Sequence, residues 1–264
     1  MHEQKNKMKT KNRISWDMIL YEIRNILGNP FIYIFGLGLP IFMSLMMSKV
    51  VTQGMTDTGI IRQVTTTVFL GNGLIIPMAT MLIGYSAVYS QEIEKGIPLR
   101  MRLFGFSEKY ILINRMIAEF LFMTVALFLY FMSNLLFLPL AVPTKTGLFL
   151  YLLCVYVFGM LLFLLAHAVS GLIRKFGPTY AVTMLLYFVM MIFGGLMGMS
   201  YQSMPKLMQA VARMIPVTYI TRDFYEVWCG EAYNCVPMLQ SYLFFAAVSG
   251  ILLFICIYKQ RRRV

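Results

Sequence analysis

Charged side chains are scarce in this sequence. Only 13% of its 264 residues are charged, whereas 59% are hydrophobic. Acidic residues number 11. A soluble domain carries about 25% charged residues, so this deficit argues against a soluble fold. Because the apolar residues are gathered in blocks along the chain, the sequence predicts an all-α protein that crosses a membrane repeatedly.

The residue patterns of known catalytic and metal sites are also absent. The four cysteines form no CxxC pair and no cluster with histidine, so no zinc site is indicated. The sequence has no GxSxG or HExxH pattern and no GxxxxGK[ST] loop to cradle ATP phosphates. We therefore expect a chain that is not itself an enzyme and that binds no metal or cofactor of its own.

Basic residues outnumber acidic ones, giving a formal net charge of +12. A nucleic-acid-binding protein shows its basic residues as a patch on a soluble fold. Here they occur in short tracts between apolar blocks, which is typical of the loops that set the orientation of a membrane protein. The charge therefore indicates membrane lipids as partners, and no nucleic acid.

Six apolar stretches are long enough to cross a hydrocarbon core of about 30 Å. We expect residues 49–67, polar and rich in threonine, to form an outside loop between the first two. We expect no cleaved leader, a cytoplasmic tail and amphipathic helix over residues 1–29, and a membrane domain over residues 30–264. The predicted spans are 31–48, 68–89, 110–138, 148–173, 178–199 and 238–258.

The amphipathic helix precedes the first span and ends at Gly28-Asn29-Pro30. Its apolar residues recur at helical spacing, so we expect it to lie at the membrane surface with these side chains toward lipid. They are Trp16, Ile19, Leu20, Ile23, Ile26 and Leu27.

Lysine and arginine counts predict the orientation. One side of the membrane receives 17 of these residues and the other six, which together make the 23 in the sequence. Since the side richer in basic residues faces the cytoplasm, both ends of this multi-pass protein should be cytoplasmic, with the cell membrane as its location.

Ionisable residues inside the spans are few. Arg115 and Glu119 lie four residues apart in the third span, where a local ion pair is expected. His167, in the fourth span, is expected to make a hydrogen bond between packed helices. An ion-driven transporter usually carries buried carboxylates, and we find little indication of them here.

Two segments stand out from the apolar background. Residues 90–107, on the cytoplasmic side, place two glutamates before Gly96 and then a short apolar and basic stretch, which suggests a docking element. The fifth span ends in glycines, and two prolines interrupt the apolar segment that follows it. Within that segment we expect a short helix over Lys206 to Ile215, either at the outer surface or re-entering the bilayer. A solvated loop is the alternative in each case.

In this order, these segments resemble the permease subunits of the type-two family of ATP-binding-cassette exporters, which includes exporters of drugs and of lipid-linked polysaccharides. Glu92-Ile93-Glu94-Lys95-Gly96 matches the family's E-x-E-x-G pattern, with Ile97 where a threonine more often follows. The helix ending at Asn29-Pro30, the six spans and the stretch from Gly194-Gly195 to Pro216-Val217-Thr218-Tyr219 complete a resemblance that covers nearly the whole chain.

The resemblance implies that the chain pairs with a second permease copy or a related permease, and that substrate passes between the two. Separate ATPase subunits would bind ATP and Mg²⁺, and residues 92–106 would form the coupling helix that contacts them. The implied coupling residues are Glu92, Glu94, Lys95, Gly96, Arg100, Arg102 and Phe104.

The resemblance also implies that the second and fifth spans line the pathway and that short re-entrant helices over residues 200–236 close it from outside. The corresponding pathway or gate candidates are Asn72, Thr80, Tyr85, Met191, Gly194, Gly195, Gly198, Pro205, Pro216 and Tyr219.

Cys229 and Cys235 both lie in the predicted outside segment, where a disulfide between them is possible and two free thiols are the alternative. Three other functions stay open from the residues alone. They are an ATP-independent secondary transporter or channel, a non-transporting accessory subunit for immunity or assembly, and a membrane enzyme, for which no catalytic groups are found.

Overall fold

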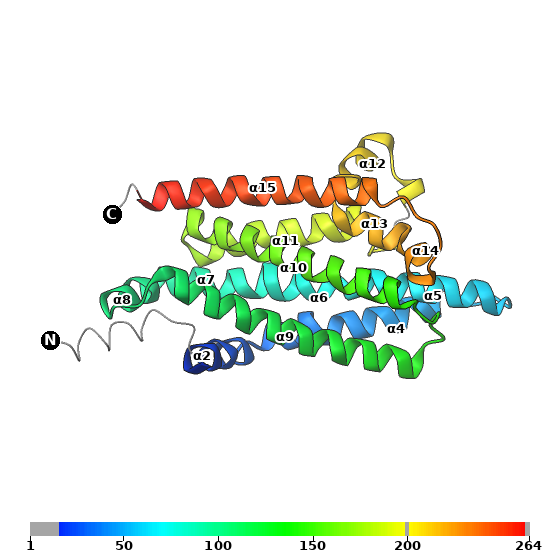
Figure 1. Ribbon diagram of the computed structural model, residues 1–264, viewed down its shortest axis with the longest axis horizontal. Coiled ribbons are helices and arrows are strands. Elements are labelled where there is room, and N and C mark those ends of the chain that lie inside the picture. Colours follow the sequence, from blue (N-terminus) through cyan, green and yellow to red (C-terminus); the bar gives the residue numbers. More distant parts are fainter. Residues whose placement is uncertain (1–15, 199–200, 262–264) are drawn as a thin grey trace.

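The structure, a computed structural model, describes residues 16–198 and 201–261. Figure 1 shows these residues as a bundle of long helices whose axes are roughly aligned. No strand occurs in these residues, and six of their helices are long and apolar enough to cross a membrane. The chain is an all-α membrane protein with six candidate spans, as predicted. The predicted tail over residues 1–13 lies outside the described residues.

The first two crossings are built from several consecutive helical pieces. The first contains α3 (Pro30–Tyr33), the π-helical η1 (Ile34–Gly38) and α4 (Leu39–Val51), and the second contains α5 (Thr58–Gly73), α6 (Ile75–Pro77), the π-helical η2 (Met78–Gly84) and α7 (Tyr85–Glu94). The other crossings are α9 (Glu108–Phe137), α10 (Lys145–Ile173), α11 (Phe176–Phe193) and α15 (Val236–Arg261).

Short helices occupy the two ends of the bundle. In Figure 1, α2 and α8 lie toward one end of the bundle, and α12, α13 and α14 lie toward the opposite end, which we call the outer end after the predicted orientation. The short helices are α2 (Trp16–Leu27), α8 (Ile97–Leu103), the 3₁₀ turn η3 (Tyr201–Ser203), α12 (Lys206–Ala212), α13 (Pro216–Arg222) and α14 (Phe224–Cys229).

The second crossing is longer than predicted. The expected loop over residues 49–67 is wrong at both ends, because α4 continues to Val51 and α5 begins at Thr58. Asp57 caps the new helix start, because its Oδ1 accepts hydrogen bonds from the backbone N–H of Gly59 at 2.7 Å and of Ile60 at 3.3 Å. The threonines that suggested a loop satisfy their hydroxyls inside the helix, as Thr66 does on Arg62 O at 2.7 Å.

The fifth crossing ends at Phe193, earlier than the predicted residue 199. Gly194 caps the helix, and Gly195 after it has a φ of +75°, a left-handed conformation that glycine adopts without strain and that stops the helix. At the other end of this helix, Pro178 lies in its first turn, where proline is tolerated.

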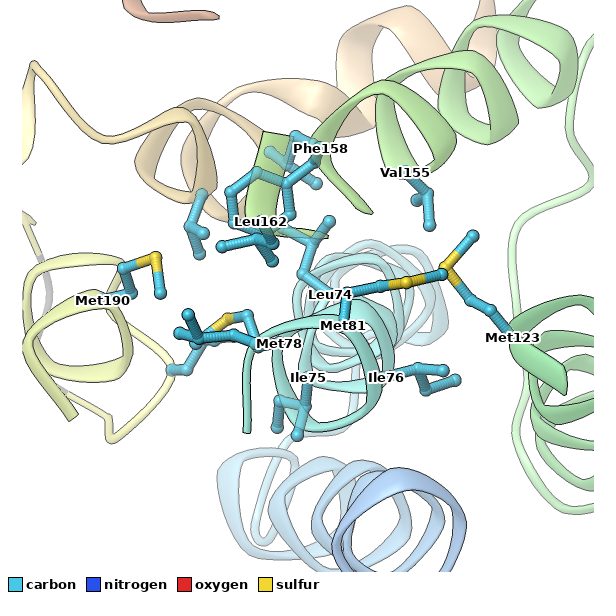
Figure 2. Packing of buried hydrophobic residues seen from close by; sticks show 14 of the residues in the cluster. Leu74, Ile75, Ile76, Met78, Met81, Met123, Val155, Phe158, Leu162 and Met190 are labelled. Atoms are coloured by element: carbon cyan, nitrogen blue, oxygen red, sulfur yellow. The ribbon is translucent and has the colours of Figure 1, made fainter. Parts of the chain in front are cut away.

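The second crossing forms the centre of the bundle. In its most apolar 18-residue stretch 89% of residues are buried, against 22% to 44% in the other five crossings. Figure 2 shows Leu74, Ile75 and Met78 projecting from this helix toward its neighbours, with Met123, Phe158 and Met190 reaching in from other helices. This helix is therefore enclosed by protein, and the surrounding helices expose their outer faces.

Candidate functional site

Helix α8 presents apolar side chains outward at the end of the bundle. Leu99, Leu103 and Phe104 expose 60%, 80% and 70% of their surface. Leu99 and Leu103 lie four residues apart and therefore share one face of the helix. Arg100 and Arg102 are also exposed, and Arg102 pairs with Glu108 at 3.0 Å. The helix is thus an amphipathic, basic projection that buries none of its own residues.

A tight turn joins α8 to the central crossing. Gly96 adopts a φ of +70°, and its N–H donates to Ile93 O at 3.1 Å, which ends α7. The next helix begins at once, since Arg100 N–H donates to Gly96 O at 3.2 Å. Lys95, which is exposed, contributes its carbonyl to Arg100 Nη2 at 3.3 Å. The direction of α8 is therefore set by one left-handed residue that favours glycine.

Glu94 turns back toward the bundle. Its Oε2 accepts a hydrogen bond at 3.0 Å from the backbone N–H of Phe176, the first residue of α11. A carboxylate at this position satisfies an unpaired helix donor and complements the positive end of the helix dipole. Glu94 thereby links the end of α7 to the start of the fifth crossing.

Glu92 belongs to a buried ion cluster that joins three helices. Arg115 on α9 donates from Nη2 to Glu92 Oε2 on α7 at 2.6 Å. The same guanidinium holds both carboxylate oxygens of Glu22 on α2, from Nε at 2.9 Å and from Nη2 at 3.1 Å. All three side chains are at most 8% exposed. We call these three residues the Arg115 cluster.

Polar and aromatic neighbours complete the Arg115 cluster. Asn25 on α2 donates to Glu92 Oε1 at 3.0 Å. The guanidinium carbon of Arg115 lies 5.5 Å from the ring centroid of Tyr89 and 5.9 Å from that of Tyr85, within the range of cation–π contacts. Burial raises the pKa of Glu22 above its usual value, although the Arg115 charge opposes this shift.

The Arg115 cluster corrects two sequence predictions. The expected local pair between Arg115 and Glu119 is wrong, because Arg115 is engaged by α2 and α7, and Glu119 Oε2 is buried without a hydrogen-bond partner in the described part of the chain. Buried carboxylates are also less scarce than expected, since Glu22, Glu92 and Glu119 are all at most 6% exposed.

Helix α2 is therefore tied to the bundle more firmly than a surface helix. Ile19, Glu22 and Ile26 are buried at spacings of three and four residues, and α2 packs along α9. Trp16 and Leu27 remain exposed. The prediction that the whole apolar face meets lipid is wrong for Ile19 and Ile26, and Glu22 lies in the middle of the face that meets protein.

His167 makes the predicted contact between helices. Its Nδ1 lies 2.7 Å from Tyr85 OH, and its ring stacks on Tyr89 with centroids 4.8 Å apart. The fourth crossing is thereby joined to α7 beside the Arg115 cluster. The hydrogen bond between helices is confirmed.

The pathway candidates of the second crossing lie inside the protomer. Asn72, Thr80 and Tyr85 are at most 2% exposed, and Thr80 bonds its own helix at Ile76 O. Met191 of the fifth crossing is 4% exposed. In this conformation these residues face packed side chains, because four other crossings enclose the central helix. None of these candidate residues faces an open path here.

The outer candidates are held by neutral hydrogen bonds. Gly194 O accepts from Thr221 Oγ1 at 2.6 Å, and Tyr219 OH donates to Arg213 O at 3.1 Å. Pro216 begins α13 and is buried, whereas Pro205, just before α12, is exposed. Gly195 and Gly198 form the turn after α11, and Gly198 is exposed with a φ of +81°. The predicted short helix is α12.

The two outer cysteines are free thiols in the structure. Cys229 is half-buried at the end of α14, and Cys235 is exposed, with its Sγ 3.8 Å from Tyr233 O. The alternative of two free thiols is therefore the one seen here, and the bridge is not formed.

Comparison with known families matches this architecture. The family model for the ABC-2 type transporter membrane domain aligns with residues 16–227, which run from the start of α2 into α14. The chain belongs to the ABC-2 type transporter family. No curated protein and no solved structure matches it in the same comparisons. The ABC-2 assignment makes the chain a permease component of a transporter and a multi-pass membrane protein, and the matched region includes α2.

Sequence reasoning missed Glu22 and Asn25 as parts of the site. A signal for Glu22 was present, because it interrupts the apolar series Ile19 and Ile26 at helical spacing. A charge on the apolar face of an amphipathic helix indicates a buried partner of opposite charge. No local feature identifies Arg115 as that partner, since it lies 93 residues away.

Proposed function

We propose that this ABC-2 permease is the membrane-spanning half of an ATP-driven exporter and that α8 docks in a groove of a separate ATPase subunit. The observation that supports it best is the exposed face of Leu99 and Leu103 at the end of the central crossing. Two apolar anchors four residues apart are the pattern by which a helix binds in a groove.

The contacts of α7 suggest how movement of α8 would be transmitted. A displacement of α8 would be passed to α7 through the turn at Gly96. From α7 it would be passed to α11 through the Glu94 hydrogen bond, and to α2 and α9 through the Arg115 cluster. A rigid central helix tied to its neighbours in this way would move them together. ATP and Mg²⁺ would be bound by the ATPase, and this chain would supply the path.

The transport path is proposed to form between two permease copies, or between this chain and a related permease. Within one protomer the central crossing is sealed by its neighbours, so a single copy has no open route along Asn72, Thr80 and Tyr85 in this conformation. Drugs and lipid-linked glycans are both compatible classes of substrate.

The basic residues support an orientation with α8 and both chain ends in the cytoplasm of a cell membrane. Lys95, Arg100 and Arg102 are exposed at the α8 end of the bundle, and α15 ends toward the same end in Figure 1. Docking on a cytoplasmic ATPase requires this orientation.

The docking proposal is tested by Leu103→Asp in the full chain. Membranes are solubilised mildly, the chain is captured, and co-purifying ATPase is measured by ATP hydrolysis. Burying a leucine contributes about 1.5–3 kcal/mol, so its replacement by a charge should reduce ATPase recovery at least tenfold. Leu207→Asp on α12 is the matched control, because Leu207 is also 80% exposed but lies at the outer end.

Equal ATPase recovery with Leu103→Asp and Leu207→Asp would overturn the docking site. If the unaltered chain recovers no ATPase at all, the exporter function fails and ion-driven flux by the chain alone becomes the next measurement. An accessory subunit would recover ATPase normally, but transport substrates would not stimulate the hydrolysis.

A further inference from the structure

A cavity of about 520 Å³ lies at the outer end, between α15 and the helices α12 and α13. Its wall combines two arginines with polar and apolar side chains of the first turns of α15. It lies at the end opposite α8 and outside the Arg115 cluster. The lining residues are Arg213, Met214, Tyr219, Arg222, Pro237, Gln240, Ser241 and Phe244.

The two arginines are positioned by aromatic side chains. Arg213 donates from Nε to Tyr201 OH at 2.7 Å, which within the described residues leaves its two terminal nitrogens available. The guanidinium carbon of Arg222 lies 4.8 Å and 5.4 Å from the ring centroids of Tyr201 and Tyr219. The two terminal nitrogens of Arg213 suit the bidentate binding of phosphate oxygens, whereas Asp223 already engages Nε and Nη2 of Arg222.

The local charge favours an anion. Arg222 is paired with Asp223, to which its Nε donates at 2.6 Å and its Nη2 at 2.5 Å, whereas Arg213 has no acidic partner in the described part of the chain. The first turns of α15 line the same cavity, and the N-terminal end of a helix carries a partial positive charge. The cavity therefore has a net positive charge.

An apolar stripe continues from the cavity along α15. Phe244 forms the inner wall, and Val248, Ile251 and Ile255 follow it at spacings of three and four residues on the same face. Phe244 is 47% exposed, Ile251 60% and Ile255 45%, so the stripe is open to lipid. A cationic cavity leading into an open apolar stripe matches an amphiphile with an anionic head.

We propose that this cavity binds the phosphate headgroup of an anionic phospholipid, with an acyl chain lying along the Phe244 to Ile255 stripe of α15. Arg213 supplies the free charge, Nη1 of Arg222 a second donor, and Gln240 a neutral side chain able to hydrogen-bond a headgroup hydroxyl. The cavity shares no lining residue with α8 or with the Arg115 cluster.

The test uses the full chain purified in zwitterionic detergent. Dioleoyl phosphatidylglycerol and dioleoyl phosphatidylcholine are offered together, and retained lipid is counted by native mass spectrometry. We expect phosphatidylglycerol to be retained preferentially and Arg213→Gln to weaken its retention about tenfold, since one charge-assisted contact is lost. Arg62→Gln is the control, because it removes an exposed positive charge on α5, outside the cavity lining.

Two further arms separate the possible outcomes. Arg213→Lys keeps the charge and should retain more phosphatidylglycerol than Arg213→Gln, provided that both variants melt like the unaltered chain. Glycerol 3-phosphate at the same concentration should displace little lipid, because it lacks the chain that occupies the α15 stripe. The proposal would be overturned if Arg213→Gln and Arg62→Gln lost equal amounts of bound phosphatidylglycerol, or if the unaltered chain retained both lipids equally. Full displacement of phosphatidylglycerol by glycerol 3-phosphate would also overturn it.

Discussion

The α8 end and the outer end of this permease are held together by different interactions. Near α8, the charges of Glu22, Glu92 and Arg115 join α2, α7 and α9. At the outer end, apart from the partly exposed pair of Arg222 with Asp223, neutral side chains bind backbone carbonyls. Tyr130 OH donates to Phe69 O at 2.7 Å, and Trp228 Nε1 donates to Ala141 O at 2.9 Å.

This difference has an energetic consequence. Removing one member of a buried ion cluster leaves an opposite charge unpaired in a medium of low dielectric. The contacts of the whole cluster are therefore lost together. A neutral hydrogen bond to a carbonyl contributes about 1 kcal/mol and can be lost alone. We therefore expect a single substitution at the α8 end to disrupt all contacts of the cluster, and a single substitution at the outer end to remove only the contact that it changes.

The largest predicted effect is at the Arg115 cluster. Arg115→Gln leaves two buried carboxylates without their cation and should destabilise the chain by about 3–5 kcal/mol. Denaturant unfolding of the purified chain, followed by circular dichroism, measures the change. Arg102→Gln is the control, because the exposed pair of Arg102 with Glu108 should contribute about 0–1 kcal/mol.

A further variant sharpens this test. Replacing Glu22 and Glu92 by glutamine together with Arg115→Gln removes all three charges, so this triple variant should be more stable than Arg115→Gln alone. If Arg115→Gln unfolds at the same denaturant concentration as Arg102→Gln, the Arg115 cluster does not hold the α8 end.

An intermediate effect is expected where backbones approach closely at the outer end. A Cβ at Gly147 on α10 would lie 2.6 Å from Val227 O and 2.7 Å from Trp228 O, and neither carbonyl belongs to a movable side chain. Gly147→Ala should therefore cost about 1–3 kcal/mol in the same unfolding measurement. Gly250→Ala, where nothing lies within 4 Å, should be neutral or slightly stabilising. Equal behaviour of the two variants would contradict the close packing of α10 on α14.

The smallest predicted effect concerns single neutral bonds. Tyr130→Phe removes the hydroxyl bond to Phe69 O but keeps the ring stacked on Phe69, so the loss should be about 0.5–1.5 kcal/mol. Tyr187→Phe is the matched control, because its buried hydroxyl has no partner in the described residues and its removal should cost nothing. A larger loss for Tyr187→Phe would show that the outer end is not organised by these hydroxyl bonds.

Much of the α8 site could be predicted from the sequence, but its internal contacts could not. The pattern from Glu92 to Gly96 and the basic stretch after it were recognisable. The family resemblance assigned Glu92 and Glu94 to contact with the ATPase, whereas in the structure their side chains bind Arg115 and the start of α11. Arg115 was paired with its nearest acid along the helix, Glu119, because partners distant in sequence have no local signal.

The sequence by itself determined the membrane class, the number of crossings and most of their boundaries, because each crossing needs a long apolar stretch whatever its neighbours are. Only the tertiary structure decided which crossing is central, which face of α2 meets protein, and where Glu22, Glu92 and Arg115 meet. All helices in a membrane are apolar, so hydrophobicity does not distinguish a lipid contact from a helix contact, and packing decides between them.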